Sequence, residues 1–233
     1  MRDTKTDNFI KPQIFMKDGI HAFFTTNLLN HNLTDSVAKL TSISKKNIYL
    51  PVQKHTNKIH VLDSDLKSVV ADAVLTEKRG LLIGVQVADC VPILLYDRDK
   101  KVIGAVHAGW RGTAAQILKN TIKTMQERFF SSSEDMLIAI GPSIRQCCYE
   151  VGDDVKTAVE VATRFREGDY YKKNGKWFID LSSANKIQAL SMGILQQNIW
   201  QSDECTFCNP DKFYSYRYTK NSLGRQGGFI GIF

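Results

Sequence analysis

The residues with the most reactive side chains are two histidines and one cysteine that lie near the ends of apolar runs. Cys90 stands in the segment VADCVP, His107 opens the segment HAGWRG, and His55 follows the apolar stretch 48–52. Two imidazoles and one thiolate form a ligand set that Zn²⁺ accepts, and three protein ligands leave a fourth tetrahedral position for water. Zinc lowers the pKa of such a water to about 7, which makes it a nucleophile at neutral pH. The spacing is long and irregular, so these residues alone are equally compatible with a buried structural thiol and a hydrogen-bonded histidine.

The glycine-containing segment after His107 is suited to binding an anion. Gly109 and Gly112 let backbone N–H groups approach a ligand, and Arg111 adds a cationic fork. A helix that begins near Thr113 would present its positive N-terminal end to the same place. These features suit a phosphate or a sugar-linked oxyanion, although a helix entry with a surface arginine explains them equally well. Neither a GxxxxGK[ST] nor a GxGxxG phosphate-binding fingerprint occurs in the chain.

The remaining cysteines carry weaker signals. The chain has five cysteines, and an odd number without a secretion signal favours reduced thiols over a disulfide framework. Cys205 and Cys208 form a lone CxxC, whose spacing is interpreted as incidental because no second pair accompanies it. Cys147 and Cys148 are adjacent, are not expected to serve one tetrahedral metal together, and are predicted simply to pack.

The elements that must position these residues mix strands and helices. Short apolar runs predict buried strands at 81–87, 91–96, 102–107, 136–140 and 227–233. Apolar residues at helical spacing predict helices over 113–130, with Thr113 as N-cap, over 153–166 and over 182–195. A polar turn at 97–100 joins two of the strands and would bring Cys90 and His107 close together. This order predicts a single mixed α/β domain over residues 1–233, without fixing the sheet topology.

Composition narrows the class of protein. The 233 residues are 43% hydrophobic, contain no apolar run long enough to span a membrane, and begin with a polar segment unlike a signal peptide. The sequence therefore predicts a cytoplasmic protein with no membrane partner. The net charge is +7, but its lysine pairs are dispersed and are not interleaved with aromatic residues, so a solvated basic surface is favoured over nucleic-acid binding.

Motifs spread over most of the chain resemble a known family, the multicopper-oxidase-like "polyphenol oxidase" or laccase-domain proteins, now associated with purine nucleoside phosphorylase activity. The matching residues are Asp72-Ala73, Ala88-Asp89-Cys90, HAGWRG at 107–112, GPSI at 141–144, CYEV at 148–151, Asp180-Leu181, Cys205-Thr206, SYR at 215–217 and GRQ at 224–226. The HAGWRG hexapeptide is the most specific of them. The resemblance implies a layered α/β fold with a central mixed β-sheet flanked by helices, related to a group described as cysteine hydrolases.

The resemblance also implies a site and an activity. The metal-binding and catalytic positions of the family fall on His55, Cys90 and His107, with zinc as the metal and copper as the alternative. The implied reactions are phosphorolysis of adenosine, inosine and methylthioadenosine and deamination of adenosine, so the protein is expected to be both a transferase and a hydrolase. Purine nucleosides and phosphate are the expected partners. The residues expected to bind substrate or phosphate are Arg111, Arg217, Arg225 and Asp72, and Asp72 or Asp89 is a candidate for moving protons or orienting a ligand imidazole.

Departures from the family pattern and rival chemistries remain. The family's N-terminal Thr-Arg-x-Gly-Gly is replaced by FTTNLL at 24–29, and Tyr218 stands where a second arginine often follows Arg217, so two cations are missing. A copper-linked phenol oxidase activity is attributed to the family, but five histidines cannot supply several coppers, which makes this a side activity at most. A metal-free amidase with Cys90 as nucleophile and His107 as base uses the same residues. A non-enzymatic binding module is not favoured by any motif.

Overall fold

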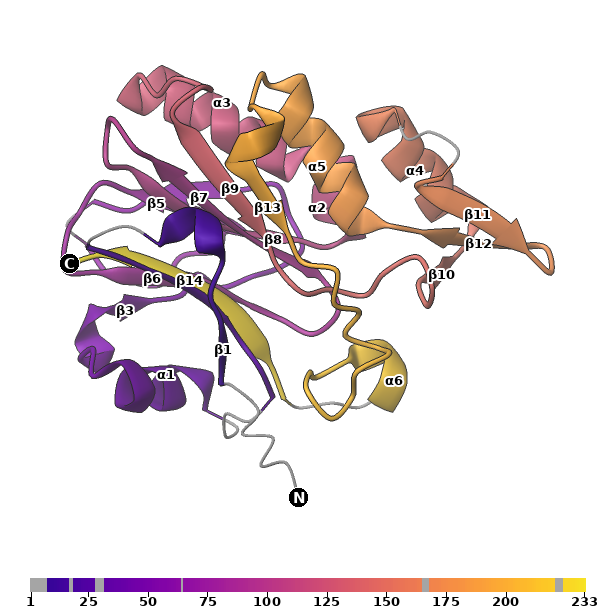
Figure 1. Cartoon of the computed structure of the whole chain (residues 1–233), viewed down its shortest axis with the longest axis horizontal. Helices are drawn as coiled ribbons and strands as arrows, with labels where there is room; N and C mark the ends of the chain where they lie inside the picture. Colours follow the sequence, from indigo (N-terminus) through magenta and orange to yellow (C-terminus); the bar gives the residue numbers. More distant parts are fainter. Residues whose placement is uncertain (1–7, 17–18, 28–31, 64, 165–167, 221–223) are drawn as a thin grey trace.

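Two large β-sheets pack face to face, with helices on their outer faces (Figure 1). The computed structural model describes residues 8–16, 19–27, 32–63, 65–164, 168–220 and 224–233. The first sheet has the strand order β1 (Phe9–Ile10), β2 (Ile20–Thr25), β14 (Gln226–Ile232), β6 (Leu82–Val87) and β3 (Ile48–Tyr49). The second has the order β13 (Ile199–Gln201), β9 (Met136–Ile140), β7 (Val91–Asp97), β8 (Ile103–Ala108), β5 (Ala73–Thr76) and β4 (Ile59–Val61).

Both sheets are mixed. In the second sheet β7 pairs antiparallel with β8 and β9, whereas β4 runs parallel to β5 and β13 parallel to β9. A small antiparallel sheet of β10 (Glu150–Val151), β12 (Lys176–Ile179) and β11 (Tyr170–Lys173) stands beside them. The mixed α/β class predicted from the sequence is confirmed, but the core holds two large sheets where one central sheet was expected.

The helices divide between the two outer faces. The helices that cover the six-stranded sheet are α2 (Trp110–Ala114), α3 (Ile117–Phe129), α4 (Asp153–Thr163) and α5 (Leu181–Ser191), whereas α1 (Leu33–Thr41) covers the five-stranded sheet (Figure 1). A short α6 (Tyr216–Thr219) and three 3₁₀ turns, Gln13–Phe15, Lys45–Asn47 and Gln196–Asn198, complete the elements. Among the described residues, no helix combines the length and apolar character needed to cross a bilayer.

Strand β7 contributes to two hydrophobic core layers, one on each face of the six-stranded sheet. All seven of its residues are buried, because Ile93 and Leu95 face the helices while Leu94 and Tyr96 face the other sheet. In β8 the alternation places His107 after Ile103 and Ala105, on the face turned toward the five-stranded sheet. His107 therefore lies at one end of the layer between the two sheets.

The predicted strands agree closely with the structure, but the predicted helices needed correction. The segment 113–130 is two helices, because Gln116 adopts a left-handed backbone conformation (φ 57°) that separates α2 from α3. Thr113 is not an N-cap; it lies inside α2, whose N-cap is Gly109, and its hydroxyl accepts a hydrogen bond from Asn185 of α5. The helix expected over 153–166 ends at Thr163, and 165–166 lie outside the described residues.

Candidate functional site

His55, Cys90 and His107 converge at the end of the layer between the two sheets. Their ligand atoms all lie within 4.8 Å of one another. The Cys90 Sγ is 3.8 Å from His55 Nε2, and the centroids of the two imidazole rings are 4.8 Å apart. The sequence prediction that these three residues share one place is therefore confirmed, whereas their role as metal ligands stays a prediction.

Sheet register brings Cys90 to His107. The antiparallel pairing of β7 with β8 sets Val91 opposite Ala108 and Pro92 opposite His107, so Cys90 enters β7 beside the end of β8. The connection from β6 to β7 also crosses from one sheet to the other, and Asp89 takes a left-handed backbone conformation (φ 83°) within it. This sharp crossing places the thiol at the edge of both sheets.

A buried carboxylate, Asp72, holds both histidines. Its Oδ1 accepts hydrogen bonds from His107 Nδ1 at 2.8 Å and from the backbone N–H of His55 at 3.0 Å. Its Oδ2 accepts from the backbone N–H groups of Lys54 and Thr56 and from the Thr56 hydroxyl, at 3.3, 2.7 and 2.7 Å. Asp72 precedes β5, whose pairing with β8 sets Ala73 opposite Val106, which brings this carboxylate under His107. With Nδ1 committed to Asp72, the Nε2 of His107 is left to face the site.

These contacts shift the protonation of the group. Burial disfavours the ionised form of Asp72, but the hydrogen bonds from His107 and Thr56 outweigh that effect and hold its pKa well below the usual range. Burial likewise opposes ionisation of Cys90 and His107. The attraction between the two charged groups outweighs the effect of burial, and it is reinforced by the hydrogen bonds of Asp72 with His107 and of His55 with Cys90. The pKa of Cys90 therefore falls to about 6, and the pKa of His107 rises to about 9. In the absence of a metal, Cys90 and His107 therefore form a thiolate–imidazolium pair at neutral pH.

The donor set fits a zinc ion. Zinc–nitrogen bonds of about 2.0–2.1 Å and a zinc–sulfur bond of about 2.3 Å at a tetrahedral angle place nitrogen and sulfur about 3.6 Å apart. The separation of His55 Nε2 from Cys90 Sγ, 3.8 Å, is close to that value. Gly109 makes room for the group, since a Cβ at this position would meet His55 Cδ2 at 3.0 Å and Cys90 Sγ at 3.1 Å. A side chain at this position would therefore force His55 or Cys90 to shift by a few tenths of an ångström.

His55, Cys90 and His107 line a cavity of about 550 Å³. Two predicted substrate-binding residues, Arg217 and Arg225, also line it. The Arg217 guanidinium donates to the Glu150 carbonyl and lies over the Tyr149 ring, 4.9 Å from its centroid. The remaining lining residues are Pro51, Gln53, Gln86, Val87, Ala88, Asp89, Trp110, Tyr149 and Tyr216. A nucleoside-sized molecule fits a cavity of this volume.

Two predicted substrate-binding residues lie elsewhere. Asp72 does not line the cavity; it is fully buried, and both its oxygens are engaged by the histidine segments. The expectation that Asp72 binds substrate is therefore corrected. The structure agrees with the alternative expectation, that Asp72 orients the imidazole of His107. Arg111 is exposed, does not line the cavity, and has its guanidinium 4.3 Å from the centroid of the Trp110 ring. Arg111 nevertheless lies close enough to the cavity residue Tyr149 for its charge to oppose the rise in the pKa of Tyr149, so phosphate binding by Arg111 stays a prediction.

Sequence reasoning missed Tyr149 and Trp110 as cavity residues. Burial, followed by the nearby charge of Cys90, raises the pKa of Tyr149 to about 12, so its hydroxyl keeps its proton at neutral pH. Both residues stand inside matched motifs, CYEV and HAGWRG, which was the available signal. The N-terminal departure at 24–29 is described only up to Asn27, because 28–29 lie outside the described residues.

Two further histidines lie away from the site. His60, in β4, lies 5.8 Å from the Tyr49 ring, and His21, in β2, lies 4.9 Å from the Phe233 ring, both distances between centroids. The interpretation of His60 as a strand-packing residue agrees with this position. Within the described part of the chain, only His55 and His107 contribute imidazoles to the group with Cys90.

Comparison with known proteins matches the chain over nearly its whole length. A purine nucleoside phosphorylase of Clostridium acetobutylicum is 36% identical over 93% of both chains. The adenosine deaminase RL5, from an unknown prokaryotic organism, is 33% identical over 93% of this chain and 89% of its own. The crystal structure of YlmD from Geobacillus stearothermophilus superposes with a TM-score of 0.88 at 26% identity, covering 98% of this chain and 97% of that one.

The family model described as "Multi-copper polyphenol oxidoreductase laccase" matches residues 27–233, which includes His55, Cys90, His107 and both cavity arginines. Curated relatives of the chain are named purine nucleoside phosphorylase and adenosine deaminase, so the family is one of purine nucleoside enzymes. This chain belongs to the multi-copper polyphenol oxidoreductase laccase family.

Proposed function

We propose that the protein is a zinc-dependent purine nucleoside enzyme, which carries out phosphorolysis of adenosine, inosine and methylthioadenosine and deamination of adenosine. One observation carries the proposal: His55, Cys90 and His107 converge on a cavity of about 550 Å³ that two arginines also line. The names of the relatives supply the substrate class. The three ligands would hold the ion, and zinc, when bound, supplies Lewis acidity toward an oxygen ligand.

Arg217 and Arg225 are our candidates for binding phosphate. A guanidinium binds phosphate through parallel hydrogen bonds, and a fixed guanidinium spends less entropy in doing so. Arg217 is fixed from two sides, by its hydrogen bond to the Glu150 carbonyl at 2.8 Å and by the Tyr149 ring. Held in this way, phosphate would be oriented for attack on the ribose C1′.

Trp110 and Tyr149 are our candidates for binding the base. Both aromatic side chains line the cavity, and a purine has an extended face suited to stacking on such rings. The Tyr149 hydroxyl remains protonated because its pKa is about 12, so it can donate a hydrogen bond to an acceptor of the purine. A donor at that place would favour departure of the base in phosphorolysis by stabilising the negative charge that develops on it.

Asp72 orients a ligand rather than moving a proton. Its low pKa keeps it ionised, and both its oxygens already accept hydrogen bonds. When His107 loses its second proton to bind a metal, the carboxylate keeps the remaining hydrogen on Nδ1 and leaves the Nε2 lone pair toward the site. This arrangement is typical of metal-ligating histidines.

The test measures zinc content and product release on the same preparation. Purified protein is expected to contain zinc and to release adenine or hypoxanthine in the presence of phosphate, and ammonia from adenosine. Cys90→Ala is expected to lose both activities by about 100-fold or more. His60→Gln, which removes an imidazole outside the site, is the matched control and is expected to keep them. Zinc-free protein that releases none of the three products would refute the proposal.

A second candidate function, a metal-free hydrolase acting on amides, is favoured by the thiolate–imidazolium pair. Cys90 is ionised above about pH 6 and His107 stays protonated below about pH 9, which is the arrangement a nucleophilic cysteine needs. Chelator separates the two candidates, since it should abolish the zinc reactions and leave a thiol hydrolase intact. Iodoacetamide should instead abolish the activity of a thiol hydrolase, because it alkylates the nucleophilic cysteine.

Copper-dependent phenol oxidation is retained only as a side activity. Two imidazoles and one thiolate also suit a single copper ion. The other described histidines, His21 and His60, lie with Phe233 and Tyr49, so the described residues do not assemble a multicopper centre. Copper-loaded protein is expected to oxidise phenols more slowly than zinc-loaded protein processes nucleosides.

A further inference from the structure

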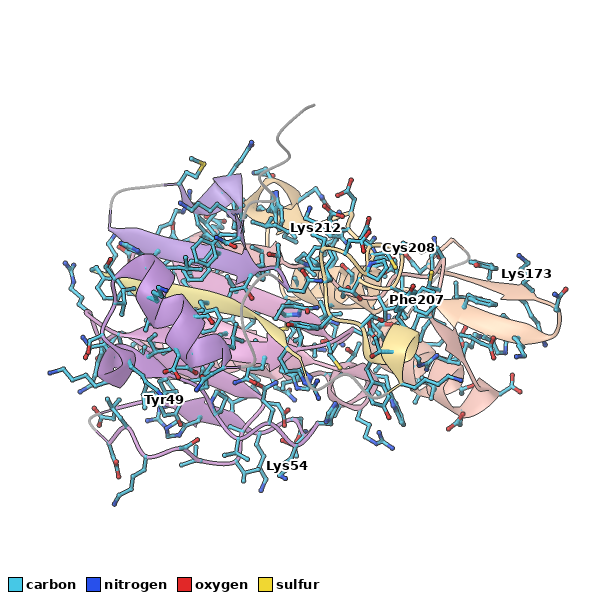
Figure 2. The ribbon with its side chains drawn as sticks, turned by 90° about the horizontal axis from the view of Figure 1, so that it is seen from below. Tyr49, Lys54, Lys173, Phe207, Cys208 and Lys212 are labelled. Carbon is cyan, nitrogen blue, oxygen red and sulfur yellow. The ribbon has the colours of Figure 1, made fainter. Side chains whose placement is uncertain are left out.

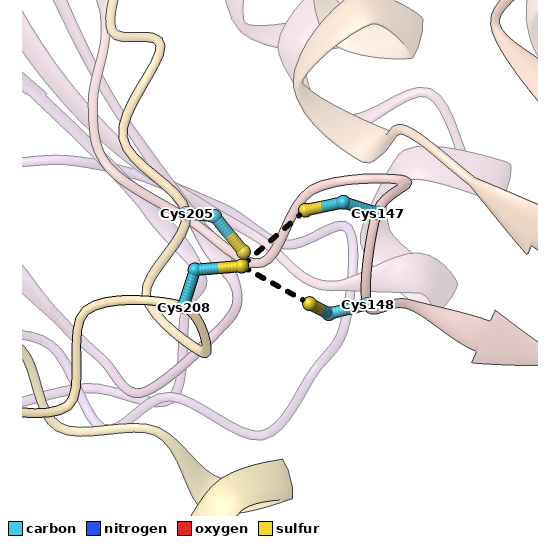
Figure 3. A group of neighbouring side chains, drawn as sticks. All are labelled: Cys147, Cys148, Cys205 and Cys208. Carbon is cyan, nitrogen blue, oxygen red and sulfur yellow. Dashed lines mark hydrogen bonds between the residues drawn. The ribbon is translucent and has the colours of Figure 1, made fainter.

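The other four cysteines form a second cluster. Cys147 and Cys148 in one loop face Cys205 and Cys208 in another, and all four Sγ atoms lie within 4.8 Å of one another (Figure 3). The Cys208 Sγ is 3.2 Å from that of Cys148 and 3.6 Å from that of Cys147. We call this group the four-cysteine cluster. It corrects the expectations that the CxxC spacing is incidental and that the adjacent cysteines merely pack.

A tight turn explains how two adjacent cysteines face the same way. The backbone N–H groups of Cys148 and Tyr149 both donate to the Arg145 carbonyl, each at 2.9 Å, so the chain reverses around Cys147. Adjacent side chains in an extended strand would point to opposite faces. In the turn, both thiols point toward the CxxC loop, as Figure 3 shows.

The two loops are held together independently of the thiols. Ser143 and Cys205 form a parallel β-bridge, and the Thr206 N–H donates to the Ser143 carbonyl at 3.1 Å. The Arg145 N–H points at the Cys205 Sγ from 3.4 Å. A backbone donor aimed at sulfur stabilises a thiolate, which is the form that binds metals. The cluster is therefore organised by the fold before any ion binds.

We propose that Cys147, Cys148, Cys205 and Cys208 bind one structural zinc ion in addition to the ion at His55, Cys90 and His107. Four thiolates at about 2.3 Å from a tetrahedral zinc are about 3.8 Å apart. The Cys208 Sγ lies 3.2 Å from that of Cys148 and 3.6 Å from that of Cys147, and all four Sγ atoms lie within 4.8 Å of one another. A set of four cysteine ligands with no open position is the usual composition of a structural zinc site. A cluster of several sulfide-bridged irons would force the thiolates further apart than this.

A disulfide accounts for less of the geometry. A bond between Cys148 and Cys208, whose Sγ atoms are 3.2 Å apart, would use two sulfurs and leave those of Cys147 and Cys205 crowded beside it without a function. One ion uses all four thiolates and supplies the positive charge that they need. Zinc therefore explains the whole cluster.

The four-cysteine cluster fastens two walls of the cavity. Tyr149, a cavity residue, directly follows Cys148, and Thr206, inside the CxxC, donates its hydroxyl to Asp89 at 2.7 Å. Phe207 lies against Tyr218 of α6, with ring centroids 5.5 Å apart; Figure 2 labels Phe207 next to this helix. Since Arg217 belongs to α6, zinc in the cluster would hold both Tyr149 and the cavity arginine in place.

The test counts metal in a variant whose first site is removed. Cys90→Ser protein, purified under reducing conditions from zinc-supplemented cells, is expected to retain about one zinc per chain. Cys90→Ser/Cys208→Ser is expected to retain less than about a tenth of that. Cys208 is exposed, so serine there should leave the fold intact, and Cys90→Ser/Cys147→Ser is the second variant, since Cys147 is exposed as well. Circular dichroism would verify folding of both.

Cobalt provides the matching spectroscopic readout. Cobalt-loaded Cys90→Ser should show the intense visible absorption of a tetrahedral tetrathiolate, and each double variant should lose it. Chelator should lower the Tm of Cys90→Ser by about 5–10 °C and leave that of the double variants unchanged. Zinc-free Cys90→Ser, iron in place of zinc, or a disulfide between the two loops in the reduced preparation would each overturn the proposal. None of these readouts requires nucleoside activity, so they stand or fall apart from the proposed function.

Discussion

Replacing Asp72 by asparagine tests whether the buried carboxylate organises the ligand set. The substitution keeps the size of the side chain but turns one acceptor oxygen into an NH₂ donor. With the remaining oxygen toward His107 and His55, the NH₂ group faces the backbone N–H groups of Lys54 and Thr56, which lose their acceptor. With the oxygen toward Thr56, the NH₂ group faces His107 Nδ1, and the imidazole must place its hydrogen on Nε2. That tautomer cannot offer Nε2 to a metal.

The two orientations of the asparagine predict measurable losses of stability and of zinc affinity. A buried donor left without an acceptor costs about 1–3 kcal/mol, so Asp72→Asn should destabilise the metal-free protein by about that amount or more. Loss of a residue that orients a metal ligand typically lowers metal affinity about 10–100-fold, which equals about 1.4–2.7 kcal/mol of binding free energy. Competition with a chromophoric chelator would measure the affinity for zinc, and thermal denaturation of metal-free protein would measure stability.

Asp97→Asn is the matched control. Asp97 is fully buried at the opposite end of β7 from Cys90, where its Oδ1 accepts from the Asp99 and Lys100 N–H groups of the turn. This variant should lose some stability and keep its zinc affinity. If Asp72→Asn binds zinc within about twofold of the unchanged protein, the carboxylate does not orient the ligands and the reasoning fails.

Three further predictions concern the same site. Gly109→Ala should lower zinc affinity by about tenfold or more, because the added Cβ meets His55 and Cys90 near 3.0 Å. Gly112→Ala is the control and should keep its zinc affinity, because its added Cβ has no contact closer than 3.4 Å. Equal zinc affinities of the two variants would contradict the crowding argument. Arg217→Ala should raise the KM for phosphate by about tenfold or more and leave deamination nearly unchanged, with the exposed Arg128→Ala as control. In metal-free protein, alkylation of Cys90 by iodoacetamide should rise as the pH passes through about 6. Cys147 is exposed as a residue, but desolvation of its sulfur inside the cluster, followed by hydrogen bonding with the neighbouring thiols, raises its pKa to about 12. Peptide mapping should therefore find Cys147 unlabelled at pH 7, and labelling of Cys90 only near pH 8–9 would show that the ion pair is absent.

Local patterns predicted most strands because burial there follows directly from short apolar runs. The runs at 91–96 and 102–107 and the turn between them correspond to β7 and β8 within a residue or two. The same reasoning merged α2 with α3, because apolar periodicity continues across the left-handed residue Gln116. The division of the strands into two large sheets could not be predicted, since no local signal shows that the chain changes sheets between β6 and β7.

For the candidate site, the separation of residues along the chain determined which contacts could be predicted from the sequence. Cys90 and His107 are joined through one hairpin, so their proximity followed from the two strands. His55 is brought to them by contacts between distant segments, through Asp72 and through the two hydrogen bonds of the Gln53 side chain with the Gln86 backbone. Its residue type placed it in the zinc set, but no local pattern predicted its proximity, and the resemblance to the family gave that assignment its main support. The four-cysteine cluster escaped because the usual zinc pattern pairs one CxxC with another, whereas here the second pair is adjacent and depends on a turn around Cys147.

Asp89 joins the edge of the sheets that carries the candidate site to the segments that carry Arg217 and the four cysteines. Its carboxylate accepts from the Thr206 hydroxyl at 2.7 Å and from the backbone N–H of Arg217 at 2.8 Å, and its carbonyl accepts from the backbone N–H of Ile144 at 3.0 Å. Both oxygens are thus engaged, which argues against the proton-transfer role and for a positioning role. Because Asp89 directly precedes Cys90 and holds its left-handed conformation within this network, a shift of the CxxC loop would move the thiolate and the cavity arginine together. The proposed metal site and the proposed phosphate site would therefore be coupled through one carboxylate, although their residues come from distant parts of the chain.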